Sequence, residues 1–522
     1  MGIIEAAVLL FGAAASTAGD TFYVATNGSD AGDGSASAPF LTLGRAQGAA
    51  RQARKPATVR LLAGEHYLDG PDAAPLVLDD AADGNVSWVG AGADATVLRG
   101  GVRVTGWAPC PAAPGVWRAP SPFRNRSAPF FTLLEGDAPA TPARFPNRGG
   151  GWLYNWTADG SVGKAGFRWD RATGLPATFE TAHARAWVWH PYGYSELTGL
   201  ADASFANRTA RLSPAPHFSL VKMFLEGARE FVDEAGEWAL GEDGFVYLCP
   251  SAGPAADPNA LVVTAVVQPR IFDIRGASSA AADVVAGVTI ANLSVVGSGM
   301  ARNFASCWES RINAQPGVDP TGQWASTREG MVRVENATDI TVTGCRLVGA
   351  GMSAVWLEHH AQRVAVEHNW IEHVGAWGVM ANGWDIGGGP HPIPGSYPFA
   401  TAAEADVNFG HTVANNFIHN VGTAVTYGAA VYVHQAHSIT VERNVLARSP
   451  RNLLSVFGVE WLYTSGGEGP YGTAAYVLAC CLLAGLLLFF LFLSPPPSSF
   501  SSHGGAGSST IRRSRPGRLM TI

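Results

Sequence analysis

The sequence is poor in charged residues, and this shortage excludes several classes of protein. Asp, Glu, Lys and Arg make up 15% of the chain, against roughly 25% in a typical soluble domain. A disordered chain normally carries more charge and fewer apolar residues than this one. The net charge of −7 comes without any basic stripe, so we expect no nucleic acid partner.

Cysteine is also scarce, which bears on metals and on cross-links. The six cysteines form no CxxC pair and show no Cys/His spacing of a zinc site. We therefore expect no metal and no cofactor. Disulfides are permitted among Cys110, Cys249, Cys307 and Cys345, but the spacing leaves their pairing open.

In place of charge the chain has glycine, tryptophan and a short repeat. Strand-like alternating runs open the segments that start at Val288, Ile340, Val364, His411 and Ile439. The last four starts are separated by 24, 47 and 28 residues, which is one or two periods in the twenties. Such a period, filled with short strands and turns, indicates a solenoid. Leucine-rich repeats share the period, but the leucines and the helical half that they need are absent.

Equivalent positions of the repeat carry equivalent residues. An aliphatic residue stands seven positions in, at Val295, Leu347, Ile371, Ile418 and Leu446. The fifth position holds Leu293, Cys345, Asn369, Asn416 or Asn444, and the eleventh holds Gly299, Gly351, Gly375, Gly422 or Pro450. We predict a stacked aliphatic core, asparagine ladders at the turns, and corners where glycine permits a positive φ. The predicted fold class is all-β, a right-handed parallel β-helix with an inserted or packed β domain and one C-terminal transmembrane helix.

Two apolar segments predict the location. Residues 6–15 resemble the apolar region of a secretory signal peptide and are too short to span a bilayer. Residues 474–493 carry no charge and as a helix would be about 30 Å long, the thickness of the hydrocarbon core. Arginines follow this segment, which places the C-terminus in the cytosol. We expect a single-pass type I membrane glycoprotein with its β-helix outside or in the lumen, at the cell surface or in the secretory pathway.

The chain thus divides into stretches of distinct character. In order they are a signal peptide (1–18), an N-terminal cap with the first coils (20–99), an inserted Trp-rich β domain (100–268), the β-helix coils (269–458), a juxtamembrane spacer (459–473), the transmembrane helix (474–493) and a cytoplasmic tail (494–522). We expect a monomer.

Several blocks resemble a known family. The opening FYVATNGSDAGDGSASAPFLTLGRAQGAAR resembles carbohydrate-active parallel β-helix proteins of the pectate-lyase-like superfamily. The blocks VLRGGVRVTGW, GVWRA, PARFPN and EFVDEAGEWALGEDGFVYLCP resemble glycoside hydrolase family 141 and its relatives. The resemblance implies hydrolysis of a polysaccharide such as xylan or a fucose-containing chain. It covers roughly residues 22–458, and this chain leaves the repeat earlier than such proteins do.

The register of the repeat predicts where the chemistry lies. Aligning the coils places Glu358, Asn382 and His434 in one column. Glycoside hydrolysis usually needs two carboxylates, one of which holds a proton near neutral pH. Asp385 is our candidate for that acid, because Trp384 beside it would both stack on a sugar and raise the pKa of the acid. Glu358 or Asp406 is the expected ionised partner.

The remaining predicted site residues would bind substrate. They are Trp384, Asn382, His434, Trp356 and Tyr432. A plainer interpretation of Glu358 is a solvated charge at a strand end, paired with His359 or His360. Two other functions stay open: a non-catalytic, membrane-tethered glycan-binding or adhesive protein, and a polysaccharide lyase with Arg363 or Arg443 as its base.

Overall fold

The computed structural model describes most of the chain between residues 19 and 457. The described ranges are 19–68, 75–123, 129–148, 156–158, 166–170, 174–189, 195–216, 222–300, 304–305, 329–382, 408–425, 428–434, 436, 438–457 and 520–521. The predicted leader, the predicted membrane span, Trp384, Asp385 and Asp406 lie outside them. No helix in these ranges is long and apolar enough to cross a membrane.

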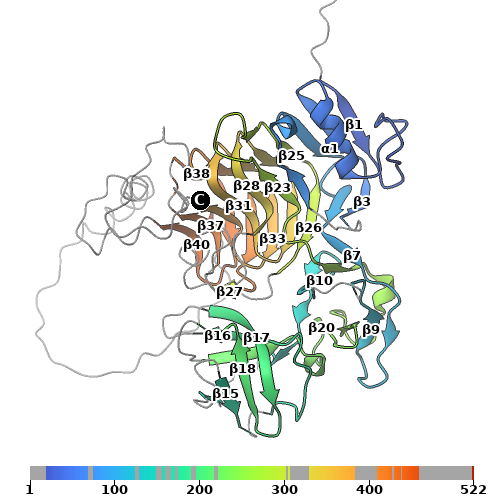
Figure 1. Cartoon of the computed structure of the whole chain (residues 1–522), viewed down its shortest axis with the longest axis vertical. Coiled ribbons are helices and arrows are strands. Elements are labelled where there is room, and N and C mark those ends of the chain that lie inside the picture. The colour runs from blue at the N-terminus through green and yellow to red at the C-terminus, as the bar shows by residue number, and fades with distance from the viewer. Residues whose placement is uncertain are drawn as a thin grey trace, which may run out of the picture.

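Three parallel sheets form the main body, and the chain visits them in rotation (Figure 1). Sheet 1 contains, in spatial order, β1 (Thr21–Val24), β2 (Ala57–Leu61), β5 (Val86–Gly90), β25 (Thr289–Ala291), β29 (Thr341–Thr343), β32 (Ala365–Glu367), β35 (Thr412–Ala414) and β38 (Thr440–Glu442). Sheet 2 contains β4 (Leu76–Leu78), β23 (Phe272–Arg275), β28 (Gly330–Thr338), β31 (Ser353–Gln362), β34 (Val379–Asn382), β37 (Ala429–His434) and β40 (Asn452–Phe457), with β24 (Val285–Ala286) beside β28. Sheet 3 contains β3 (Gly64–Tyr67), β6 (Thr96–Arg99), β26 (Ser294–Ser298), β30 (Arg346–Ala350), β33 (Trp370–Val374), β36 (Phe417–Val421) and β39 (Val445–Ala447), and β41 (Met520–Thr521) pairs antiparallel with β39.

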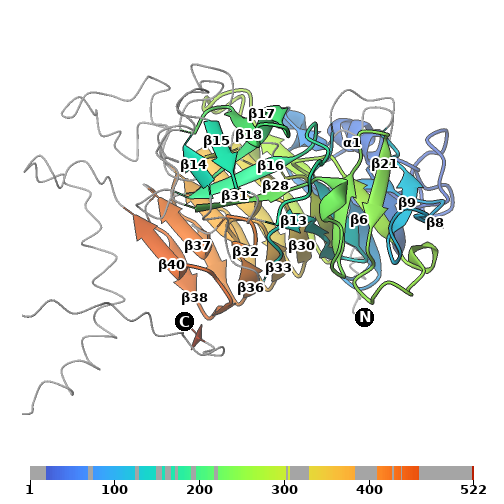
Figure 2. The same cartoon turned by 90° about the horizontal axis from the view of Figure 1, so that it is seen from below.

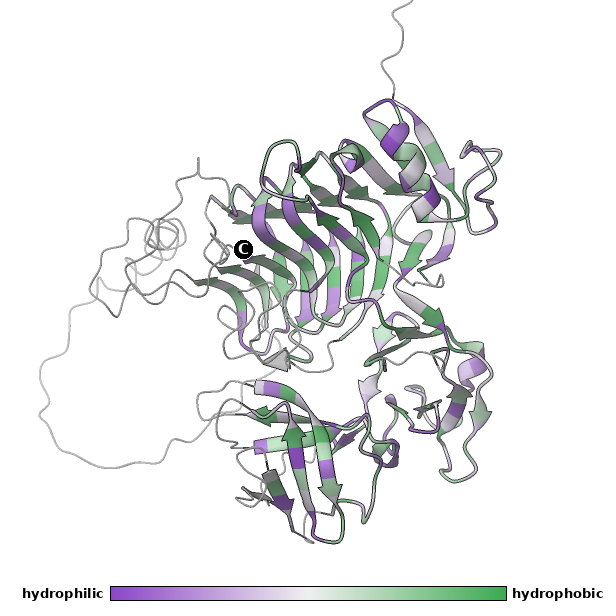
Figure 3. Ribbon diagram, in the orientation of Figure 1, coloured by the Kyte–Doolittle hydropathy of each residue, from purple (hydrophilic) through white to green (hydrophobic). Residues whose placement is uncertain are grey.

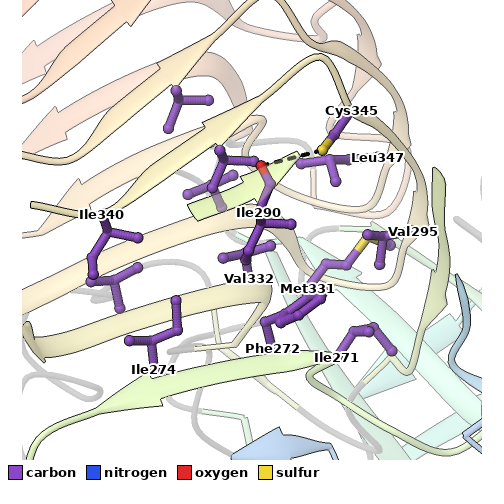
Figure 4. Close-up of a cluster of buried hydrophobic side chains, with 14 of the residues drawn as sticks. Ile271, Phe272, Ile274, Ile290, Val295, Met331, Val332, Ile340, Cys345 and Leu347 are labelled. Atoms are coloured by element: carbon purple, nitrogen blue, oxygen red, sulfur yellow. Dashed lines mark hydrogen bonds between the residues drawn. The ribbon is translucent and has the colours of Figure 1, made fainter. Parts of the chain in front are cut away.

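The predicted stacking of the aliphatic residues is confirmed. Val295, Leu347, Ile371, Ile418 and Leu446 are direct neighbours in the register of sheet 3. All five are fully buried in one continuous core that the three sheets enclose. Figure 3 shows the alternation of apolar and polar residues along these strands, and Figure 4 shows part of the core around Ile290 and Leu347. The side-chain period of two therefore sends every second residue into the stack.

The predicted asparagine ladder is also confirmed. The Asn416 side chain accepts from the backbone N–H of Asn369 at 2.9 Å and donates to the Asn444 Oδ1 at 3.0 Å. The Asn369 Oδ1 accepts from the backbone N–H of Cys345 in the same way at 2.9 Å. Cys345 thus stands in the ladder position, where burial raises the pKa of its thiol to about 11 and makes it an inert core residue.

The explanation predicted for the repeated glycines is wrong at three of the four positions. Only Gly422 has a positive φ, of 65°. A Cβ on Gly375 would lie 1.9 Å from the Gly351 carbonyl oxygen, and one on Gly351 would lie 2.4 Å from the Gly299 carbonyl carbon. These glycines are needed because the backbones of successive coils touch there. Positive φ values at other corners fall on further glycines and also on Asn, Asp, His, Arg and Ser residues.

One helix closes the N-terminal end of the stack. Helix α1 (Leu43–Gln52) begins at Thr42, whose side chain accepts from the Arg45 N–H, and so supplies one of the bonds that a helix start lacks. Leu43, Ala46 and Ala50 join the core of the stack. Helix α1 therefore covers the first coil, as repeat folds need.

Strands between β6 and β23 leave the stack and form three further sheets (Figures 1 and 2). The first contains β11 (Ala138–Pro139), β10 (Thr132–Glu135), β22 (Val263–Val266) and β7 (Gly101–Arg103), and the second β12 (Thr141–Pro142), β20 (Glu237–Leu240), β21 (Phe245–Leu248), β9 (Trp117–Pro120) and β8 (Ala108–Pro109). The third, called the inserted sheet below, contains β13 (Arg144–Phe145), β19 (Lys222–Glu226), β16 (Arg185–Trp189), β17 (Ser195–Ser204), β18 (Thr209–Ser213), β15 (Gly166–Trp169) and β14 (Trp156–Ala158), with β27 (Phe304–Ala305) beside β17. Short 3-10 turns lie at η1 (Ala81–Asp83), η4 (Arg229–Phe231) and η5 (Pro258–Ala260).

Candidate functional site

The outer face of sheet 2 is covered by the inserted sheet through an aromatic layer. The layer contains Trp187, Trp189, Leu197 and Phe224 of the inserted sheet and Met352, Trp356, Trp377, Met380 and Tyr432 of the stack. Trp356 and Trp377 meet edge to face at 5.8 Å, and Trp377 meets Tyr432 in the same way at 6.1 Å. The predicted substrate-binding residues Trp356 and Tyr432 are therefore packed between two sheets, with only 1% and 8% of their surface exposed.

Two indole nitrogens in this layer find no hydrogen-bond partner in the part of the chain that the structure describes. They are the buried Nε1 atoms of Trp356 and Trp377. A buried N–H donor without an acceptor costs about 1–3 kcal/mol, so each of these two N–H groups lowers the stability of the layer.

Glu358 lies at the edge of the aromatic layer, in a buried network of charges. Its Oε1 accepts from the Arg333 Nε at 2.8 Å and from the Arg333 Nη2 at 2.5 Å. Arg333 also reaches Glu335 at 2.5 Å and Asp273 at 3.4 Å. Glu358 has no exposed surface. The interpretation of Glu358 as a solvated charge is therefore wrong, because the side chain is buried, and Arg333 is a partner that the sequence analysis did not name.

The network continues away from Glu358 through further pairs. Arg270 contacts Asp273 at 3.0 Å and Glu329 at 2.6 Å, and His359 Nδ1 lies 2.8 Å from Glu335. Burial lowers the pKa of Arg333, but the surrounding carboxylates outweigh it and the pKa is raised. Burial raises the pKa of Glu329, and Arg270 only partly opposes this. We call Arg270, Asp273, Glu329, Arg333, Glu335 and Glu358 the ion network.

The ion network brings two carboxylates close together. Glu335 Oε2 and Glu358 Oε1 both accept from Arg333 Nη2 at 2.5 Å, which limits the separation of these oxygens to 5.0 Å. Retaining glycosidases hold their two carboxyl groups about 5–5.5 Å apart. The guanidinium group between them stabilises both as carboxylates, however, so neither is suited to hold the proton of a general acid.

The predicted column of Glu358, Asn382 and His434 is confirmed in register. Glu358 pairs with Asn382 between β31 and β34, and Asn382 pairs with His434 between β34 and β37. Asn382 is buried and is the last described residue before the segment that carries Trp384, Asp385 and Asp406. The middle residue of the column is therefore close in sequence to the residues among which we expect the acid, and these three residues remain predictions.

Sequence reasoning missed Arg333 and the aromatic residues of the inserted sheet. Arg333 stands 25 residues before Glu358, about one period of the repeat, so alignment of β28 with β31 would have placed them on adjacent strands. No comparable signal exists for Trp187 or Phe224. Their position opposite sheet 2 depends on how the inserted sheet folds back, which no local pattern encodes.

Glu237 also has a strongly altered pKa, but its carboxyl group stabilises a turn. Burial raises the pKa of Glu237 to about 7, although the backbone N–H groups of Asp233, Glu234 and Arg144 oppose the shift. These amides donate to its two oxygens at 3.1–3.2 Å. Glu237 thus holds the start of β20 against the preceding turn.

The described cysteines and acidic groups hold no cross-link and no metal site. Cys110, Cys249 and Cys345 are free thiols, and Cys307 lies outside the described ranges. Within those ranges no group of His, Cys, Asp and Glu is arranged to hold a metal ion.

Comparison with known proteins identifies the fold. No family model matches the chain, and no match is found among curated proteins. A solved structure titled "Glycoside hydrolase" is similar with a TM-score of 0.67 and 17% identity, covering 85% of this chain and 80% of that one. A second, "The complex structure of XylC with xylose", reaches a TM-score of 0.39 with 12% identity over 84% of this chain and 63% of that one. The chain therefore has the fold of the first structure, built of parallel sheets, and the identity is too low to transfer more.

Proposed function

We propose that this chain is a glycoside hydrolase, and that its three-sheet stack is the right-handed parallel β-helix of family 141 and related pectate-lyase-like proteins. The expected substrate is a xylan- or fucan-like polysaccharide. The likeness to a glycoside hydrolase structure supports the proposal, as do the sequence blocks that resemble the family. Stacked coils make a linear surface, which suits a polymeric substrate.

One observation carries the choice of site. Glu358 has a fully buried carboxyl group that accepts two hydrogen bonds from Arg333, and it lies in register beside Asn382. An ionised carboxylate at the substrate can attack or stabilise the sugar cation that forms in the transition state. The proton for the leaving oxygen must come from a second carboxyl group outside the influence of Arg333. Asp385, three residues beyond Asn382, is our candidate, with Asp406 as the alternative partner.

We expect the purified chain to release reducing sugar from xylan or a fucan, and Asp385→Asn to lower the rate by about 100-fold or more, because general acid catalysis contributes on this scale. Asp94→Asn is the matched control, since Asp94 is exposed at a turn before β6. Both variants should have the same melting temperature as the wild type. An Asp385→Asn variant as active as the control would reject the acid assignment. Binding of the polysaccharide without any hydrolysis would instead favour the alternative function, a non-catalytic glycan-binding protein.

The lyase alternative is less well supported. A lyase on this fold would use an arginine base, which requires a lowered pKa. The hydrogen bonds from Arg363 to Asp339, at 2.7 and 2.8 Å, raise the pKa of Arg363. Arg443 contacts Glu442 at 2.5 Å. Both arginines therefore have carboxylate partners at corners of the stack.

We also propose that residues 474–493 tether the chain to a membrane as a single-pass type I protein. Pairing of β41 with β39 does not fit this topology, because a cytosolic tail cannot reach an extracellular strand. An epitope tag after residue 522 should be stained in cells only after permeabilisation. Staining of the tag on intact cells would reject the tether and favour the β41 pairing.

A further inference from the structure

The outer face of sheet 3 carries an exposed aromatic residue, whereas most large apolar side chains among the described residues are buried. Among the described residues the exposed large apolar side chains are Leu41, Trp370 and Val456. Leu41 lies in the turn before α1, and Val456 lies on the last strand of sheet 2. Trp370 is different, because β30 and β36 flank it on both sides and 45% of its surface is still exposed. It is the only aromatic residue in this exposed set.

Trp370 is held in a fixed orientation by neighbours from the next coil. Its ring stacks on Phe417 with 4.2 Å between ring centres and 28° between planes, and Phe417 stacks on His419 at 5.5 Å. Its Nε1 donates to Glu372 Oε2 at 2.8 Å. Strands β33 and β36, which carry these rings, lie side by side in Figure 2. We call Trp370 and Phe417, with Glu372, His373 and His419 at their edge, the Trp370 platform.

Hydrogen-bonding groups surround the two rings. Glu372 Oε1 lies 3.2 Å from His373 Nε2 and 3.5 Å from His419 Nδ1, and the Asn420 Nδ2 donates to His373 Nδ1 at 2.8 Å. Burial lowers the pKa of His373, so its ring is neutral at neutral pH, accepting from Asn420 and donating to Glu372. Glu372 keeps acceptor capacity after these contacts, since a carboxylate has about four acceptor positions.

This combination fits a sugar ring better than it fits a protein. A pyranose presents one apolar face of C–H groups, which the negative face of an aromatic ring attracts, and it presents hydroxyls at its edge that need carboxylate, amide and imidazole partners. A stable protein partner would require about 800 Å² of contact on this side, and charged groups begin immediately beyond the two rings. The occupant to which the geometry points is one or two sugar rings of a chain.

We propose that the Trp370 platform is a second glycan-binding site, on sheet 3, separate from the reaction site on sheet 2. The core of the stack lies between the two outer faces. The platform would hold one stretch of a polysaccharide while another reaches Glu358. The proposal rests on the proposed function only in taking a glycan as the ligand.

Affinity electrophoresis tests the platform with the full-length protein. In native gels that contain xylan or fucoidan, wild-type protein should be retarded, and Trp370→Ala should bind about tenfold more weakly, the loss expected for one aromatic stacking contact. Leu41→Ala is the matched control, since Leu41 is 47% exposed and lies away from the platform. Trp370→Phe should recover part of the retardation. Melting curves of all variants should coincide.

The outcomes separate the platform from the reaction. If Trp370→Ala is retarded like the wild type, or if wild type is not retarded while it still cleaves a short aryl glycoside, the platform is rejected and the hydrolase stands. If retardation depends on Trp370 but no glycoside is cleaved, the platform stands and the hydrolase is rejected. Equal cleavage of the aryl glycoside by wild type and Trp370→Ala is expected, because a short substrate does not span both faces.

Discussion

Replacing Ile371 by Asp is expected to prevent stable folding. Ile371 is fully buried between Leu347 and Ile418 in the column of sheet 3. The change removes about 1.5–3 kcal/mol of apolar burial and adds several kcal/mol for an unpaired buried carboxylate. Total stabilities are about 5–15 kcal/mol, so one substitution consumes most of the margin. Soluble yield and thermal melts by circular dichroism would measure the loss.

Val456→Asp is the matched control for this substitution. Val456 is also β-branched and lies on a strand, but 41% of its surface is exposed. We expect its melting curve to stay close to that of the wild type, because a solvated carboxylate incurs little desolvation. Equal tolerance of Asp at both positions would show that Ile371 does not face the core.

Replacing Arg333 by Met is the second change with a large expected effect. Glu358 has no exposed surface and would lose both hydrogen bonds from Arg333. Breaking a buried ion pair on one side costs about 3–5 kcal/mol. Glu335 would keep His359 and Asp273 would keep Arg270, and Glu358 would lose two hydrogen bonds that water cannot replace at a side chain with no exposed surface. Melts of the variant should show a clear destabilisation.

Two further variants test the cause of that loss. In Arg333→Met with Glu358→Gln the buried charge is gone, and we expect much of the stability to return. Arg363→Met removes an exposed pair with Asp339, with side chains 49% and 53% exposed, and should cost about 0–1 kcal/mol. A double variant as unstable as Arg333→Met would contradict the buried-charge explanation. A stable but inactive double variant would support a role of Glu358 in hydrolysis.

The stacking of the coils was predictable because several copies of the repeat give independent evidence for the same register. One wrong aliphatic residue would not have changed the register of Val295, Leu347, Ile371, Ile418 and Leu446. The asparagine ladder was predictable for the same reason, since identical side chains one coil apart must meet. The prediction of a positive φ at the repeated glycines was mostly wrong, because a sequence does not distinguish a glycine needed for its φ from one needed for contact between backbones.

The candidate site was predictable only in part. The column of Glu358, Asn382 and His434 follows from the repeat, and its register is confirmed. The burial of Glu358 does not follow from it, because that depends on Arg333 and on the inserted sheet. Trp356 was expected to face substrate. The alternation of side chains along β31 does turn Trp356 outward, but the inserted sheet lies on that face.

The sequence by itself determined which residues point into the stack and which stand in the same column, since these follow from the side-chain period of two and the period of the coils. Only the tertiary structure decided which outward face is covered and which is open. The inserted sheet packs on sheet 2 and buries Trp356, while Trp370 on sheet 3 remains exposed. The physical reason is that burial of an outward residue depends on a partner distant in the chain, and no periodicity within its own strand records that partner.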